Sequence, residues 1–331
     1  MTKKLVAVTL LSTLLLQAQD HSQHAHHNHA DIIAAPVGVH GDHVHGKGTL
    51  MLGLARMNMS MDGNIQGSSD IDAAGIGAIA GYNAMMAPKT MDMQMDMLHV
   101  MYGLSSKLAV MAMVPTIESE MLMNNDAVMN GNGLGDIGLG LSYQAKNDKS
   151  TELVYSLTVN LPTGSIDETM ANGNTAPYPM QTGSGSYALV PTVTYIKKNS
   201  YYAMGSQVEA TMQLNDNEQD YKLGNKYMAQ AWFSYAASKS VALSARLQYN
   251  SKENISGADT RTSGIMSPTA DEDSQAYQNA LAYYGINYEA KSGVLKGHSI
   301  GLEYGVPVYQ NADNIHMKWD NSLIVSWEKV F

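Results

Sequence analysis

Sulfur or imidazole occupies every second position in the stretch from Met91 to Met101. The alternating residues are Met91, Met93, Met95, Met97, His99 and Met101. Side chains two positions apart share a face on an extended strand, whereas a helix would scatter these six residues around its circumference. Thioether sulfur suits Cu(I), and imidazole binds several transition metals. The stretch therefore predicts a strand that carries a row of candidate metal ligands on one face.

The strands expected on either side carry further methionines. Those near residues 49–61 and 107–117 hold Met51, Met57, Met59, Met61, Met111 and Met113, and the next loop adds Met121, Met123 and Met129. Hairpin neighbours are adjacent in an antiparallel sheet, so these residues are expected on one wall. A turn at residues 104–106 would place His99 opposite Met111. The same register would place Met97 opposite Met113, which makes a ladder of thioethers and imidazole.

Histidines are concentrated near the N-terminus, where eight of the eleven precede residue 46. The first tract comprises His21, His24, His26, His27 and His29, and the second comprises His40, Asp42, His43 and His45. Imidazole is a common metal ligand, and histidine-rich tracts are typical of metal binding. Because the first tract lacks apolar residues to fold around, we expect it to be a flexible chelator of Zn(II), Cu(II) or Ni(II). The second tract adjoins a strand and should be better ordered. The alternative is a solvated polar tail.

The two ends of the chain are informative about where it resides. Residues 1–19 have a charged start, an apolar run from Leu5 to Leu16 and small residues at the end, a pattern typical of a secretory signal peptide cleaved near Ala18 or Gln19. Cleavage removes two lysines and changes the formal net charge from −10 to −12, which is unfavourable for nucleic-acid binding. The chain stops at Phe331 after an alternating apolar segment. That ending resembles the assembly signal of bacterial outer-membrane barrels.

Between these ends, segments of about ten alternating residues recur, joined by connections that are alternately short and long. The expected strands lie near residues 49–61, 90–102, 107–117, 135–145, 151–161, 187–197, 201–214, 222–237, 240–250, 275–289, 298–310 and 321–331. Short connections are basic and long ones acidic. The predicted fold class is all-β, an antiparallel up-and-down transmembrane β-barrel of about 12 strands with a flexible N-terminal segment. A soluble β-sandwich would leave the loop asymmetry and the terminal Phe331 unexplained.

Whether the methionine ladder faces the lumen or the lipid can be judged from the residues on the other face of its strand. Even positions there are apolar at Leu98, Val100 and Tyr102 but polar at Asp92, Gln94 and Asp96. Charged side chains are costly in hydrocarbon, so either this half of the strand projects beyond the membrane, or a bulge turns Met91 to Met95 toward lipid. We favour projection, which puts the methionines and His99 inside. The competing interpretation is that methionine is only a flexible apolar filler.

Two apparent catalytic motifs are weak. The glycines between residues 131 and 140 are not followed by Lys-Ser or Lys-Thr, so they do not form a phosphate-binding loop. His298 and Ser299 are strand neighbours that point to opposite faces, which is the wrong geometry for a hydrolase pair. The chain also has no cysteine, which excludes thiolate chemistry. We therefore expect no enzyme.

Four segments together resemble a known family: Pro36–His45, Met57–Met61, Met91–Tyr102 and Gly133–Gly140. The family comprises bacterial outer-membrane proteins described as putative transporters or placed with the phenol meta-pathway degradation group. The resemblance covers nearly the whole mature chain and is most specific over residues 36–140. It implies passage of small hydrophobic compounds across the outer membrane and no catalysis. Members with the Gly-Asp-His and methionine-rich strands look suited to copper.

The resulting hypothesis divides the chain into a signal peptide (1–19), a His-rich periplasmic segment (20–48) and an outer-membrane barrel (49–331). The favoured function is transport or binding of a transition-metal ion, copper first, with Cu(I), Cu(II) or Zn(II) as the bound ion and no obligatory cofactor. The candidate ligands are His21, His24, His26, His27, His29, His40, Asp42, His43, His45, Met57, Met59, Met61, Met91, Met93, Met95, Met97, His99, Met101, Met111 and Met113.

Two alternatives stay open. One is a channel for small hydrophobic or aromatic compounds, and the other is a non-conducting metal-sequestering or structural protein of the outer membrane. The expected partners are membrane lipid, lipopolysaccharide and, through Phe331, the barrel-assembly machinery.

Overall fold

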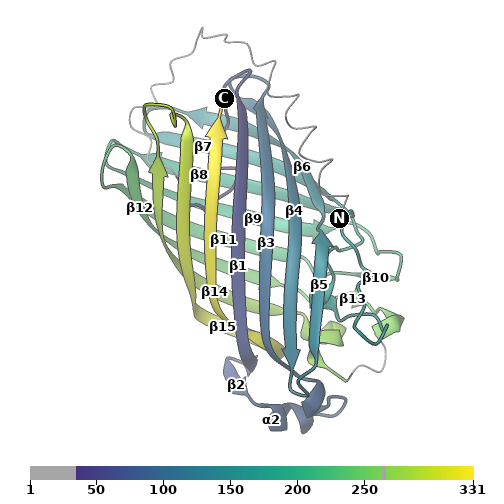
Figure 1. Cartoon of the computed structure of the whole chain (residues 1–331). Coiled ribbons are helices and arrows are strands. Elements are labelled where there is room, and N and C mark those ends of the chain that lie inside the picture. Colours follow the sequence, from purple (N-terminus) through teal and green to yellow (C-terminus); the bar gives the residue numbers. More distant parts are fainter. Residues whose placement is uncertain (1–34, 263–265) are drawn as a thin grey trace. The chain divides into compact units, whose positions relative to one another are not determined.

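A computed structural model describes residues 35–262 and 266–331, and nearly all regular structure in them is β-strand. The expected signal peptide (1–19) and first histidine tract (21–29) lie outside these residues. Among the described residues, no helix is long and apolar enough to cross a bilayer. One antiparallel sheet closes on itself, with the yellow arrow of β15 beside the purple β1 (Figure 1).

In the described chain, eleven labelled strands follow one another around the wall, and the last pairs with the first. They are β1 (Leu50–Gly67), β3 (Pro88–Gly103), β4 (Leu108–Met123), β6 (Ile137–Asn147), β7 (Thr151–Leu161), β8 (Ala188–Lys198), β9 (Tyr202–Gln213), β11 (Lys226–Ala236), β12 (Val241–Lys252), β14 (Tyr277–Glu289) and β15 (His298–Val330). β5 (Val128–Leu134) precedes β6 in the chain and pairs with the second half of β4, while β6 pairs with the first half. The closed antiparallel barrel predicted from the sequence is confirmed.

The smaller elements belong to the loops. They are β2 (Ser69–Ile71), α2 (Ala73–Gly77), η2 (Ala84–Met86), η3 (Tyr178–Met180), β10 (Tyr221–Lys222), β13 (Ser256–Gly257), η4 (Thr260–Thr262), η5 (Pro268–Ala270) and η6 (Glu272–Ser274). β10 and β13 pair only with each other, apart from the wall. All of these elements lie in connections at one end of the barrel, which we call the loop end. The other end holds residues 50 and 330 and is called the terminal end.

β15 is a hairpin despite being one continuous strand of 33 residues. Residues 299–311 run antiparallel to β14, and residues 312–330 run antiparallel to β1. The side chain of Gln310 bonds the backbone N–H and carbonyl of Trp319, which joins the two arms. Counted by arms, the wall has twelve strand positions, in agreement with the expected number. The second arm begins at residue 312 rather than 321, because β1 continues to Gly67 and pairs with it.

Side chains alternate between the two faces of the wall as the sequence predicts. On β7, Tyr155 and Leu157 point outward and are exposed, whereas Ser156 and Thr158 are buried inside. Arg246 on β12 is buried too, although it is charged. The apolar outer face is the surface that a lipid bilayer requires, and the polar side chains of these strands face the lumen.

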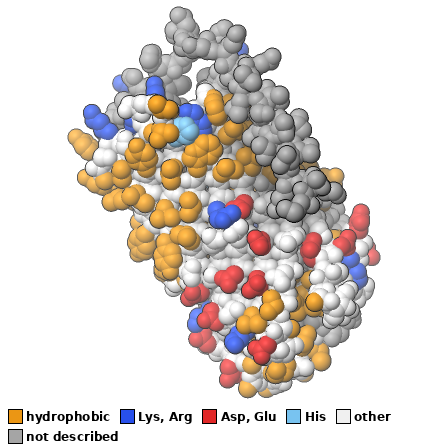
Figure 2. All heavy atoms as spheres, viewed as in Figure 1, with side chains coloured by type: hydrophobic (Ala, Val, Ile, Leu, Met, Phe, Trp, Pro, Cys, Tyr) orange, Lys and Arg blue, Asp and Glu red, His pale blue; other side chains and the backbone are white. Residues whose placement is uncertain are grey.

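The outer face of β1, β3 and β4 changes character along the strands. Figure 2 shows hydrophobic side chains gathered over one half of this face and acidic ones over the other. In the acidic half, Arg56 pairs with Asp96 at 2.6 Å and Ser60 donates to Asp92 at 2.6 Å, all exposed. The pairing of β1 with β3 runs from Leu50 to Asp62 with no register shift. The alternative of a bulge that turns methionines toward lipid is therefore wrong, and Met91 and Met101 are buried on the inward face.

Candidate functional site

The N-terminal segment (residues 35–48) lies inside the barrel. Glu303 on β15, Gln207 on β9 and Asn287 on β14 all face the lumen. Glu303 accepts a hydrogen bond from the N–H of Gly38 at 2.6 Å, and Gln207 donates to the carbonyl of His40 at 2.7 Å. Asn287 donates to the carbonyl of Ala35 at 3.0 Å. The second histidine tract is thus held by the wall.

A belt of buried hydrogen bonds holds this segment on one side of the lumen. Gln207 donates to Thr194 at 2.7 Å, Gln230 donates to Gln207 at 2.7 Å, and Arg246 donates to Gln230 at 2.8 Å. Arg246 also forms a two-pronged ion pair with Glu303, at 3.0 and 2.9 Å, and both side chains are completely buried. Ionised partners with matched hydrogen bonds make strong, directional contacts.

Gly38 fits between these charges only because it has no side chain. A Cβ atom at this position would stand 2.2 Å from Nη2 of Arg246 and 2.9 Å from Oε2 of Glu303. Both atoms are held in the buried ion pair, so neither side chain can move aside easily. The backbone of the segment therefore docks directly on the polar belt.

An imidazole–thioether cluster, made of His43, His45 and Met51, lies nearer the terminal end. Asp42 Oδ1 is 2.6 Å from Nδ1 of His43, and Nε2 of His43 is 3.1 Å from Nε2 of His45. Nε2 of His45 is 3.2 Å from the sulfur of Met51, which is buried. The Asp42 carboxylate raises the pKa of His43 to about 9, against the opposing effect of burial.

His40 and His99 face each other across a small pocket. Their ring centroids are 6.4 Å apart in an edge-to-face arrangement, and Met97 and Glu328 also line the pocket. Within the described chain, Nε2 of His99 is buried without a hydrogen-bond partner. Buried polar atoms normally have partners, so this nitrogen marks a place suited to a ligand or water.

The methionine row lies inside the wall, but its register differs from the prediction. Opposed pairs across β1, β3 and β4 include Met57–Met95, Met59–Met93, Met61–Met91, Met51–Met101, Met91–Met121 and Met101–Met111. His99 is opposite Met113, and Met97 is opposite Pro115. The predicted pairs His99–Met111 and Met97–Met113 are therefore wrong. The reason is that Gly103 pairs with Ala109, so the turn is longer than residues 104–106 and shifts the register by two residues.

A methionine cluster packs inside the barrel near the loop end. Its buried members are Met59, Met61, Met91, Met121, Met123, Met129, Ala176, Met180 and Met317, and Met93, Met170 and Trp319 pack against it. The connection between β7 and β8 supplies Met170, Ala176 and Met180. This connection therefore packs against the methionines of the wall.

Sequence reasoning missed several participants in both clusters. Met180 and Met317 come from a loop and from the last strand, and no local pattern signals their approach to β1 and β3. The candidate ligands predicted from the sequence do not include Met51. Its inward odd position, six residues after His45, is a signal that could have found it.

The expected ligands come together only in part. Met101 and Met111 pack with Met51 beside the imidazoles, while Met59, Met61 and Met91 belong to the methionine cluster. Met57, Met95, Met97 and Met113 are partly buried between these groups. Residues 21–29 lie outside the described chain. Among described residues, no three His, Asp or Glu side chains converge as a metal site.

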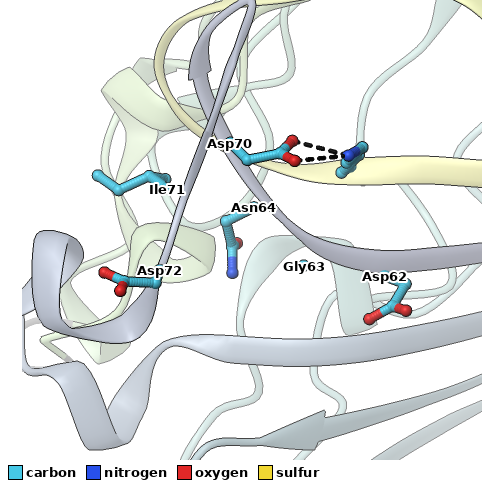
Figure 3. A pocket seen from close by; sticks show the side chains of 7 residues that line it. Asp62, Gly63, Asn64, Asp70, Ile71 and Asp72 are labelled. Atoms are coloured by element: carbon cyan, nitrogen blue, oxygen red, sulfur yellow. Dashed lines mark hydrogen bonds and ion pairs between the residues drawn. The ribbon is translucent and has the colours of Figure 1, made fainter.

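One pocket lies on the surface at the loop end. It has a volume of about 450 Å³ and is lined by Asp62, Gly63, Asn64, Asp70, Ile71, Asp72 and Lys318 (Figure 3). Lys318 binds both oxygens of Asp70 at 2.7 and 2.9 Å, and Asp72 caps α2 by accepting from Gly75 at 2.8 Å. Asp70 and Asp72 therefore already have structural partners in the loops.

A family model described as "Putative MetA-pathway of phenol degradation" matches residues 97–308. The chain belongs to this family. No curated protein matches. Among solved structures, the family barrel is similar to the COG4313 outer membrane channel from Pseudomonas putida F1, with 12% identity, a TM-score of 0.64, and coverage of 90% of this chain and 100% of that one.

Other solved structures are less similar. The beta domain of the Bordetella autotransporter BrkA has 11% identity and a TM-score of 0.49, with coverage of 86% and 100%. The Pseudomonas putida toluene transporter TodX has 12% identity and a TM-score of 0.41, with coverage of 87% and 91%. The fold is that of a bacterial outer-membrane β-barrel. The neighbour from strain F1 is described as an outer membrane channel.

Proposed function

We propose that this family barrel is an outer-membrane channel for small hydrophobic compounds, aromatic ones included. Membership in a family described by phenol degradation favours this solute class over the transition-metal ion that the sequence placed first. The terminal end, by this proposal, faces the periplasm. The loop end faces the cell exterior and receives the solute.

The observation that carries the proposal is the methionine cluster. It joins the wall to the β7–β8 connection with unbranched thioether side chains, which repack easily around differently shaped apolar molecules. A sugar or an ion would gain no hydrogen bonds from this surface, whereas an aromatic ring would exchange water for polarizable sulfur and carbon. The cluster therefore acts as a selective apolar passage at the loop end.

Uptake into intact cells tests the proposal, because lipopolysaccharide slows the entry of hydrophobic compounds. The full-length chain is expressed in a porin-deficient Gram-negative host, and entry of radiolabelled phenol is compared with entry of an uncharged sugar. Expression should speed phenol uptake several-fold and leave sugar uptake unchanged. Equal acceleration of both solutes, or of neither, would contradict the proposal.

Matched substitutions at two buried, opposed methionines separate an apolar lining from a metal-ligating one. Met91→Leu with Met121→Leu keeps the surface apolar and should retain phenol uptake. Met91→Gln with Met121→Gln makes it polar and should remove most of the acceleration. If the leucine pair abolishes uptake, the thioether itself is required and an apolar lining is not the explanation.

A further inference from the structure

We propose that His43, His45 and Met51 form a site for one soft monovalent metal ion, Cu(I) or its analogue Ag(I), inside the barrel. The site goes beyond the proposed channel function and does not depend on it. Its three donor atoms are two imidazole nitrogens and one thioether sulfur, joined by contacts of 3.1 and 3.2 Å. Thioether ligands select Cu(I), and imidazole is an accepted co-ligand.

The orientation of His43 is set by a neighbouring carboxylate. Asp42 Oδ1 lies 2.6 Å from Nδ1, so the Nδ1 proton is held there and Nε2 points toward His45. A carboxylate that accepts the far proton of an imidazole is the usual outer-shell support of a metal-ligating histidine. In the absence of a metal, the same Nε2 can hold a proton shared with His45, and the metal ion would take its place.

The two contacts of His45 Nε2 bring three donor atoms together. A ring nitrogen carries at most one proton, and a thioether sulfur carries none. The lone pairs of His43 Nε2, His45 Nε2 and the Met51 sulfur are therefore close enough for one cation to bind all three.

The spacing is close to what a metal needs. Bonds from a metal to imidazole nitrogen are about 2.0–2.1 Å, which places two nitrogens in a trigonal or tetrahedral shell about 3.3–3.6 Å apart. The observed 3.1 Å separation between the ring nitrogens requires only a few tenths of an ångström of side-chain rotation. The side chain of His43 is about one-third exposed to the lumen, so an ion can reach it.

The ligands come from two different elements. His43 and His45 belong to the N-terminal segment, while Met51 lies on β1, which is paired on both sides. The connection between them is short, and Gly48 donates to the carbonyl of Gly103 at 2.8 Å. Bound metal would therefore fasten the segment to the wall at the terminal end, in addition to the polar belt.

The test uses the full mature chain refolded in detergent, with His21, His24, His26, His27 and His29 changed to Gln so that they do not compete. Cu(I) affinity is measured by competition with a chromophoric chelator, and the ligands are identified by X-ray absorption. The parent should bind one Cu(I) with a sulfur ligand. Met51→Leu should remove that sulfur and weaken binding by more than the roughly 10–100-fold that loss of an outer-shell partner costs.

Met61→Leu is the matched control, because Met61 is also buried on the inward face of β1 but lies at the other end. It should bind Cu(I) like the parent and keep the sulfur signal. Asp42→Asn should weaken binding about 10–100-fold without removing sulfur, and His45→Gln should abolish it. Binding unchanged by Met51→Leu, or a sulfur signal lost in Met61→Leu, would overturn the site. Neither result bears on phenol uptake, so the two proposals fail separately.

Discussion

At the scale of single residues, Arg246 and Glu303 form an ion pair inside the barrel. Both side chains are buried, and Arg246 additionally lies 3.9 Å above the ring of Tyr283. Removing two charges from water is expensive, and only close hydrogen bonds on every side compensate for it. Glu303 has these bonds from Arg246 and from the N–H of Gly38.

Breaking this pair should strongly destabilise the barrel. Glu303→Gln leaves Arg246 buried without its counter-charge, so we expect the free energy of unfolding to fall by about 3–5 kcal/mol. Urea unfolding in lipid vesicles, followed by tryptophan fluorescence, measures the loss. Asp96→Asn breaks an exposed pair with Arg56 and should cost less than about 1 kcal/mol. Equal costs at the two sites would show that burial is not what makes the Glu303 pair important.

At the scale of elements, the outward faces of β7 and β3 differ in polarity. Leu157 is in the middle of β7 and faces outward among apolar neighbours, whereas Gln94 is on the outer face of β3 between two aspartates. If the loop half of β3 projects beyond hydrocarbon, a lysine costs little there. We expect Leu157→Lys to destabilise by about 2–4 kcal/mol and Gln94→Lys by about 0–1 kcal/mol. Unfolding from lipid vesicles measures the loss of stability for both variants. A large loss for Gln94→Lys would show that β3 lies fully in the bilayer.

Strand positions and faces could be predicted from the sequence because alternation is local. Each strand with one apolar side reveals its face within a few residues, as β7 does. Register was less accessible, because the hydrophobic pattern repeats every two residues and a turn two residues longer fits it equally well. His99 is consequently opposite Met113 instead of Met111. The site was found only in part for the same reason. The approach of Met180 to β1 and β3 depends on contacts between distant parts of the chain, and so does that of Gly38 to Glu303.

At the scale of the whole molecule, two obstructions lie along the lumen. The methionine cluster lies near the loop end, and the N-terminal segment lies between the polar belt and the terminal end. By the proposed function, a solute passes both in turn. The segment is attached to the wall by hydrogen bonds and close packing, so a change at its docking point should alter the whole passage.

Gly38→Ala should displace the segment, because its Cβ would overlap Arg246. We expect a higher single-channel conductance in planar bilayers and faster protease cleavage within residues 35–48. Gly46→Ala is the control, since a Cβ there meets only the hydroxyl of Thr49 at 4.0 Å. That variant should conduct like the parent. Identical traces from all three proteins would show that the segment does not limit the passage.

The polar belt has a consequence for how molecules travel. Its side chains come from β8, β9, β11, β12 and β15, while the methionines come mainly from β1, β3 and β4 on the opposite part of the wall. Amides and charges therefore lie on one part of the wall and thioethers on another, at different depths of the barrel. By the proposed function, a ring that bears a single hydroxyl group would meet the apolar cluster first and the hydrogen-bonding belt second. Its hydroxyl would find a partner only at the belt, whereas a hydrocarbon would find a partner at neither.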